Sequence, residues 1–169
     1  LSTPAYTLPQ TQGFGWGVTA GLVWKVAEAM QFGVAWSSKQ RMDELEWNTA
    51  AGKFSMRMDA PQTLALGLAW RPAQGLLVEA DVKQIWFKQV LDRVTVERPA
   101  GYTGPIPAAM PFGWSDQTVF AIAAQKDIGE RMQVRAGFNY GKSPIEPGDV
   151  NTNIGSLAVH GTTNDLAVA

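Results

Sequence analysis

Six stretches of the sequence alternate between large apolar residues and small or polar residues, and they occur in pairs joined by short turns. In the clearest stretch, residues 16–26, every even position is apolar and the odd positions are mostly small or polar. Successive side chains of a β-strand point to opposite faces of the sheet, so this stretch has one apolar face. Strands of globular proteins run about five or six residues, whereas a strand that crosses a bilayer needs about 9–11. The length and phase of the alternation therefore predict transmembrane β-strands.

The alternation also predicts which stretches pair. We expect three antiparallel hairpins, at residues 13–41, 61–90 and 117–142. Their turns are expected near Glu28, Ala73 and Gly129. The final residues, 166–169, resemble a seventh strand that is cut off.

The phase of each strand assigns its faces. Thr19 and Gln133 are expected on the inner face, where small and polar residues gather. The residues expected to face hydrocarbon are Leu22, Val34, Leu66, Val78, Ile122 and Val134.

The connections between the stretches are of two kinds, three tight turns and three long segments at residues 41–60, 91–115 and 141–163. Such loops argue against the strand assignment in a compact soluble domain. Outer-membrane barrels, however, have short periplasmic turns and long extracellular loops, and some of the loops here are expected to carry strand extensions above the membrane. The sequence thus favours an all-β fold, an antiparallel transmembrane β-barrel.

Composition is consistent with this fold. Charged residues make up 17% of the chain, below the roughly 25% typical of soluble domains. With 14 basic and 15 acidic residues, the charge gives no basis for binding nucleic acid. The sequence has no apolar run of about 18 residues, which excludes a transmembrane helix, and no cysteine, which suits passage through an oxidising periplasm. The first residues carry no signal-peptide pattern, so we expect a removed signal or a chain that begins inside a longer protein.

Tryptophans lie near the expected ends of the strands. Trp24 and Trp70 lie near short turns, and Trp16 and Trp86 lie near the opposite ends. The amphipathic indole ring suits the aromatic girdles at the two membrane interfaces. The alternative is the core of a soluble β-sandwich, but the long, consistently apolar faces favour the girdle.

Four segments carry a likeness to a known family: residues 13–17 (GFGWG), 32–39 (FGVAWSSK), 113–120 (GWSDQTVF) and 132–145, which contains MQVRAGFNY and SPI. In order and spacing they resemble the FadL family of outer-membrane transporters of long-chain fatty acids and aromatic hydrocarbons. The resemblance covers nearly the whole chain. It implies a location in the Gram-negative outer membrane.

The resemblance further implies a barrel of about fourteen strands plugged by an N-terminal hatch. A hydrophobic ligand would be captured among extracellular loops, enter the interior and leave sideways through a gap in the wall. Residues 1–169 would then be a partial barrel domain of six strands and a truncated seventh. Seven strands cannot close so wide a wall, and an open edge is not tolerated in lipid. The expected partners are therefore the rest of the barrel, the hatch, and outer-membrane lipid or detergent.

Apolar residues in the two longer early loops form the first candidate binding site. Exposed apolar patches on such loops often mark ligand sites. The expected capture surface comprises Leu45, Trp47, Phe54, Tyr102, Ile106, Met110, Phe112 and Trp114. Of these, Trp47, Phe54, Phe112 and Trp114 are the predicted ligand-binding residues. The alternative is that these side chains only pack against one another as a lid.

Polar residues on the expected inner face form the second candidate site. Arg135 and Asn139 share one face of a strand, and the forked guanidinium suits a ligand carboxylate. A structural ion pair is the alternative for Arg135. A second group, Glu79, Asp81 and Lys83, is expected either to fill the lumen as a solvated ladder or to contact the hatch or ligand.

The sequence offers little for catalysis. The only histidine is His160, in the last long segment, and no serine or aspartate lies where strand geometry would complete a triad with it. One histidine and no cysteine give no zinc site, and no cofactor is expected. No enzyme activity is therefore expected, and the resemblance implies passive transport of a hydrophobic small molecule, a long-chain fatty acid or a hydrocarbon. The alternatives are a soluble all-β ligand-binding domain and a general porin, although a porin lumen would be more densely charged.

Overall fold

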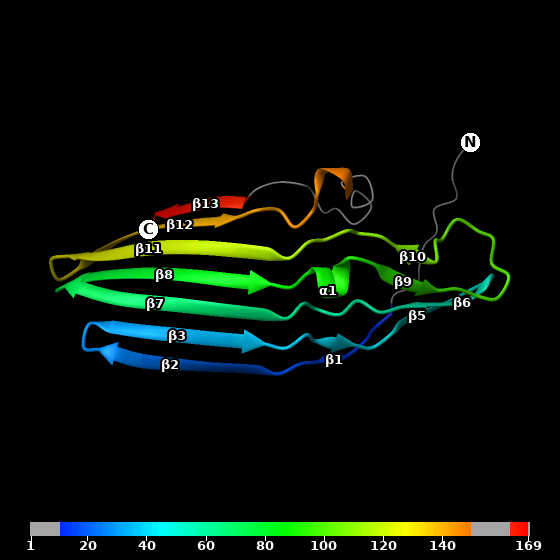
Figure 1. Cartoon of the computed structure of the whole chain (residues 1–169), viewed down its shortest axis with the longest axis horizontal. Coiled ribbons are helices and arrows are strands. Elements are labelled where there is room, and N and C mark those ends of the chain that lie inside the picture. Colours follow the sequence, from blue (N-terminus) through cyan, green and yellow to red (C-terminus); the bar gives the residue numbers. More distant parts are fainter. Residues whose placement is uncertain (1–10, 150–162, 169) are drawn as a thin grey trace.

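A seven-stranded antiparallel sheet dominates the computed structural model, which describes residues 11–149 and 163–168 (Figure 1). Its strand order is β13-β12-β11-β8-β7-β3-β2. The strands are β2 (Thr19–Ala27), β3 (Met30–Ser37), β7 (Thr63–Ala73), β8 (Leu76–Ile85), β11 (Gln117–Ile128), β12 (Met132–Gly141) and β13 (Thr163–Val168). Six of these are 8 to 12 residues long, close to the length that a tilted strand needs to cross a bilayer.

The three predicted hairpins are found as β2–β3, β7–β8 and β11–β12. The predicted bounds of the second are wrong at its end: pairing stops at Ile85, and residues 88–90 belong to the short helix α1 (Lys88–Leu91). Their turns lie together at one end of the sheet, on the left of Figure 1. Gly75 and Gly129 have φ of +66° and +64°, a backbone conformation that a residue with a Cβ rarely adopts. The predicted seventh strand is confirmed as β13, which begins earlier than expected; Ala169 lies outside the described residues.

The first hairpin differs from the prediction by a break in its ladder. Beyond β2 and β3 the chain forms a separate two-stranded sheet of β1 (Gly15–Trp16) and β4 (Arg41–Met42). Between the two sheets, the Val18 N–H donates to Ser38 Oγ at 2.9 Å, and the Ser38 N–H donates to the Val18 carbonyl at 2.8 Å. The serine side chain thus supplies a hydrogen bond across the chain where the β-ladder is interrupted.

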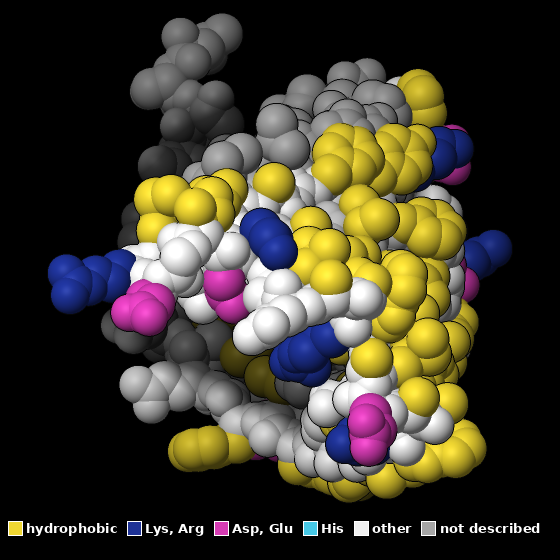
Figure 2. Space-filling view, turned by 90° about the vertical axis from the view of Figure 1, so that its left-hand side faces the viewer, with side chains coloured by type: hydrophobic (Ala, Val, Ile, Leu, Met, Phe, Trp, Pro, Cys, Tyr) yellow, Lys and Arg dark blue, Asp and Glu magenta, His cyan; other side chains and the backbone are white. Residues whose placement is uncertain are grey.

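Register aligns apolar side chains in rows across one face of the sheet. One such row runs Leu22, Val34, Leu66, Val82, Phe120 and Tyr140. The next runs Trp24, Phe32, Leu68, Ala80, Ile122 and Phe138. Leu22 is 65% exposed and Ile122 54%, and Figure 2 shows hydrophobic side chains gathered along one side of the molecule. So large an apolar face is typical of a barrel wall in lipid.

The opposite face of the same strands carries small and polar residues in matching rows. One row consists of Val23, Gly33, Gly67, Asp81, Ala121 and Asn139. The neighbouring row consists of Lys25, Gln31, Ala69, Glu79, Ala123 and Gly137. We call this the inner face. Thr19 and Gln133 lie on it, as predicted, because their register partners Ser37 and Asp127 belong to its rows.

A second, smaller sheet extends beyond the other end of the wall, as expected for strand extensions of the long loops (Figure 1). It has the strand order β10-β9-β6-β5. Its strands are β5 (Leu45–Thr49), β6 (Gly52–Met56), β9 (Val94–Glu97) and β10 (Ala109–Met110). We refer to this sheet and its connecting loops as the distal lobe.

In the described part of the chain, helical structure is limited to short segments. Helix α1 (Lys88–Leu91) follows β8, and the 3-10 turn η1 (Pro147–Asp149) follows β12. Within the described ranges, no helix is long and apolar enough to span a membrane. His160 and most of the last long segment lie outside the described residues.

Candidate functional site

The predicted capture residues of the first loop are interior residues of the distal lobe. Trp47 is 8% exposed and Phe54 is 2% exposed, and they pack with Val96. Five partly buried side chains complete this core: Leu45, Met56, Tyr102, Ile106 and Met110. The rings of Phe54 and Tyr102 meet edge-to-face, with centroids 4.9 Å apart.

The expectation that these side chains form an exposed surface is therefore wrong for Trp47 and Phe54. Each lies on the face of its strand that the 102–110 loop covers, so burying it stabilises the lobe. This packing agrees with the alternative that the loop side chains pack against one another as a lid. A ligand-binding role for Trp47 and Phe54 stays a prediction.

The other two predicted capture residues, Phe112 and Trp114, do not belong to this core and lie in the chain between β10 and β11. Phe112 is 9% exposed, so the expectation of an exposed side chain is wrong for it too, and Trp114 is half-buried. The Trp114 ring meets Phe87 edge-to-face, with centroids 5.0 Å apart. Trp114 also forms a β-bridge with Ile145, beyond the end of β12. The sequence predicted one surface for the four residues, but Trp47 and Phe54 pack in the lobe core, whereas Trp114 packs against Phe87 outside it.

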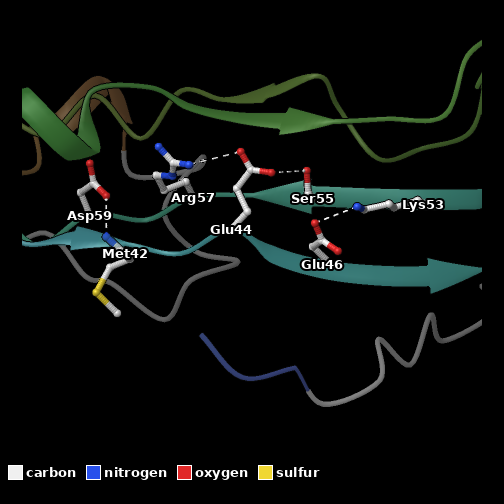
Figure 3. Close-up of polar contacts among 7 residues, drawn as sticks. All are labelled: Met42, Glu44, Glu46, Lys53, Ser55, Arg57 and Asp59. Carbon is white, nitrogen blue, oxygen red and sulfur yellow. Dashed lines mark hydrogen bonds and ion pairs between the residues drawn. The ribbon is translucent and has the colours of Figure 1, made fainter. Parts of the chain in front are cut away.

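A partly buried carboxylate joins the distal lobe to the wall. Asp59 Oδ2 lies 3.1 Å from Lys39 Nζ, and Asp59 Oδ1 accepts a hydrogen bond from the Met42 N–H at 3.0 Å (Figure 3). Gln40 and Ala60 form a backbone bridge beside them, with two hydrogen bonds of 3.0 and 3.1 Å. Burial raises the pKa of Asp59, but the Met42 hydrogen bond and the charges of Lys39 and Arg57 outweigh it and hold the pKa below its usual value.

This joint predicts a specific response to acid. Because the folded-state pKa of Asp59 is lowered, its carboxylate stabilises the fold above the unfolded-state pKa of about 4, and that stability is lost as the pH falls through the folded pKa. A complete barrel with the parent residue should therefore lose thermal stability in acid more steeply than Asp59→Asn. The two should converge at low pH. Parallel thermal-unfolding profiles of parent and variant from pH 7 to pH 3 would contradict this assignment.

A polar cavity of about 280 Å³ lies beside the Asp59 joint. Its charged and hydroxyl lining residues are Glu44, Ser55, Arg57, Asp59, Arg93, Thr95 and Glu97. Within it, the Glu44 carboxylate accepts hydrogen bonds from Arg57 Nη2 and from the Ser55 hydroxyl, each at 3.4 Å. Outside the cavity lining, Lys53 on β6 forms an ion pair of 2.7 Å with Glu46 on β5 (Figure 3). This side of the lobe is thus polar, whereas the predicted capture residues pack into its apolar core.

The polar pair predicted on the inner face is found on β12, one small residue apart on that face. Arg135 is exposed and donates from Nε to Gln125 Oε1 at 2.7 Å and from Nη2 to Gln133 Oε1 at 2.8 Å. Among the described residues Arg135 forms no ion pair, so the structural ion pair considered from the sequence is not found there. Its structural contacts are instead hydrogen bonds to two glutamines. Asn139 Oδ1 is buried and has no hydrogen-bond donor within the described part of the chain.

Three hollows lie along the wall where its inner face carries small residues. Two adjoin over β2, β3 and β7, with volumes of about 340 and 260 Å³, and share Val23, Gly33, Gly67 and Asp81. The third, of about 330 Å³, is lined by Leu77, Glu79, Ala123, Ala124, Gln125, Arg135, Ala136 and Gly137. The sequence singled out Glu79, Asp81 and Arg135, but the alignment of Gly33 with Gly67 follows only from the strand register.

Solved structures of outer-membrane transporters resemble this chain. A FadL homologue of Pseudomonas aeruginosa matches 77% of it with a TM-score of 0.65 and 17% identity. The toluene transporter TbuX of Ralstonia pickettii matches 76% with a TM-score of 0.59 and 22% identity. The toluene transporter TodX of Pseudomonas putida matches 79% with a TM-score of 0.56 and 25% identity. The chain spans only 34%, 36% and 37% of these three structures, respectively.

Comparison with curated proteins found no match. A family model, by contrast, covers nearly the whole sequence. The model described as "Outer membrane protein transport protein (OMPP1/FadL/TodX)" matches residues 5–156. With the seven-stranded sheet and its similarity to barrel walls of the same group, this match shows that the chain belongs to the OMPP1/FadL/TodX family of outer-membrane transport proteins.

Proposed function

We propose that this chain forms part of the wall and extracellular mouth of a barrel that carries hydrophobic small molecules across the outer membrane. The observation that carries the proposal is the division of the sheet into two faces. The apolar rows suit lipid, and the inner rows leave hollows of about 260–340 Å³. Membership of a family of transport proteins supports a transport role over an enzyme activity.

The ligand class is a hydrophobic compound, either a long-chain fatty acid or a hydrocarbon. Two of the similar structures are toluene transporters, which supports the hydrocarbon. The hollows are open on the inner face and lined mainly by apolar and small residues, so an elongated or flat apolar body fits against them. In this proposal Arg135 and Asn139 supply polar contacts farther along the wall, and Phe112 and Trp114 line the approach from the distal lobe.

The remaining strands and the hatch are proposed partners of the chain. Strand β2 is at the edge of the sheet, and the backbone groups on its side away from β3 need a further strand, because unpaired edges are not tolerated in lipid. A soluble binding domain, the first alternative, would need to cover the apolar rows with another layer. Within the described residues no such layer lies on that face, and its side chains are exposed.

An uptake assay tests the proposal. A complete barrel that carries this sequence is produced in cells lacking their own hydrophobic transporters, with a general porin at equal abundance as the control. Radiolabelled toluene and oleate should enter faster than in the porin control, whereas a small sugar should enter more slowly. Equal entry of all three compounds would favour the general-porin alternative. No gain for either hydrophobic compound would refute the proposed function.

A further inference from the structure

One row of the inner face sets a carboxylate against two glycines. Register aligns Val23, Gly33, Gly67 and Asp81 on β2, β3, β7 and β8. A methyl group added at Gly67 would collide with Asp81 Oδ1, which is the closest heavy atom to that position. The Asp81 side chain therefore leans across β7, over the space that Gly67 leaves empty. Gly67 thus fixes where the negative charge lies.

The carboxylate leans toward the two adjoining hollows. Asp81 lines both of them, and Glu79 lines the smaller one. Of the residues that the structure describes, no lysine or arginine lines either hollow. The other lining side chains are apolar or small, apart from Gln31. A molecule in these hollows meets an apolar surface with negative charge at one edge.

The cations near this row form no ion pair with it among the described residues. Lys83 occupies the next inner-face position along β8, and Lys25 lies in the neighbouring row on β2, three strands away. Among the described residues, the ion pairs are Lys39–Asp59, Lys53–Glu46 and Arg57–Glu44. Neither Glu79 nor Asp81 therefore has a cationic partner within the described part of the chain.

We propose that Asp81, held over Gly67, is a specificity-determining residue that favours uncharged hydrophobic molecules over those that end in a carboxylate. The inference rests on the proposed function, since it concerns which ligand passes along this wall. A ligand carboxylate near Asp81 meets like charge, and the narrow interior of a barrel screens that repulsion less than bulk water does. An uncharged molecule buries the same apolar area against Val23 and the small residues without this penalty. A ligand hydroxyl, moreover, can donate a hydrogen bond to the Asp81 carboxylate.

Two ligands with the same chain and different head groups test the charge effect. Dodecanol and dodecanoate are titrated calorimetrically at pH 8 into a complete, detergent-purified barrel that carries this sequence. The parent should bind dodecanol about tenfold more tightly, a ratio expected for like charges at partial screening. Asp81→Asn removes the charge at nearly constant volume. It should lower the ratio toward one by tightening dodecanoate binding, with dodecanol binding little changed, while the Glu79 charge at the smaller hollow remains.

A second variant moves the charge without removing it. In Gly67→Ala the new methyl group occupies the space over which Asp81 leans, so the carboxylate must turn away, and the ratio should again fall. Asp127→Asn is the matched control. This aspartate also lies on the inner face but near the short turn, where it accepts a hydrogen bond from Gln133 at 2.9 Å, and it lines neither hollow. The control should keep the parent ratio.

The outcomes separate this inference from the proposed function. Equal affinity of the parent for both ligands would overturn the role of Asp81. An unchanged ratio in Asp81→Asn with a lower melting temperature would overturn it too, and would assign Asp81 to an ion pair with another part of the barrel. If Asp81→Asn does not fold, the affinity ratios of the parent and of Gly67→Ala test the role of Asp81 instead. Failure of the parent to bind either ligand would instead count against the proposed function.

Discussion

Replacing Ile122 with arginine is expected to destabilise a complete barrel by about 2–4 kcal/mol, the penalty for a cation on the lipid face at mid-membrane. Ile122 lies near the middle of β11 and is 54% exposed in the apolar row between Ala80 and Phe138. If that face meets hydrocarbon, the guanidinium loses most of its hydration. The change is measured as the free energy of unfolding from lipid vesicles in urea.

The matched control is the next residue on the same strand. Ala123 has the same depth along β11 but lies on the inner face, directly opposite Glu79. Ala123→Arg should cost much less, because its charge points to the lumen and faces a carboxylate. Gln133→Arg, also on the inner face, should likewise cost little. Equal penalties for Ile122→Arg and Ala123→Arg would show that the two faces are wrongly assigned.

The wall was predictable from the sequence because its signal is local. Lipid on one side and lumen on the other impose a period of two on each strand, so residues such as Leu22, Val34 and Leu66 mark the same face without knowledge of their partners. Short turns then pair each strand with the next one. Strand existence, hairpin pairing and face assignment therefore all followed from neighbouring residues.

The distal lobe was less predictable because its contacts are non-local. Trp47 and Phe54 lie on strands of only five residues, which are too short to show a clear alternation of apolar and polar positions. They are buried because a loop about 50 residues later in the sequence folds over them. Apolar residues in a polar loop have the same sequence pattern whether they wait for a ligand or fill a core. The Asp59 joint and the placement of Asp81 over Gly67 also depend on pairing between separate strands, which periodicity within one strand does not give.

Phe54→Ala should have the largest effect in the distal lobe. Phe54 is 2% exposed and contacts Tyr102 within a core that few other side chains fill, so its truncation should lower the opening free energy of the lobe by about 3–5 kcal/mol. Hydrogen exchange of the amides of β5, β6 and β9 measures that opening directly. Amides in the middle of β8 and β11 should keep their protection, because the wall is a separate sheet.

The same variant separates the two roles considered for the loop aromatics. Phe14→Ala serves as the control, because Phe14 is 83% exposed and lies outside the lobe core, so lobe exchange should be unchanged. If Phe54 only supports a lid, Phe54→Ala will speed lobe exchange and leave hydrocarbon uptake intact. If the lobe must be ordered for ligand capture, uptake will fall together with protection while the wall remains folded. Loss of uptake with lobe protection unchanged would instead show direct contact between Phe54 and the ligand, against the buried position of its ring.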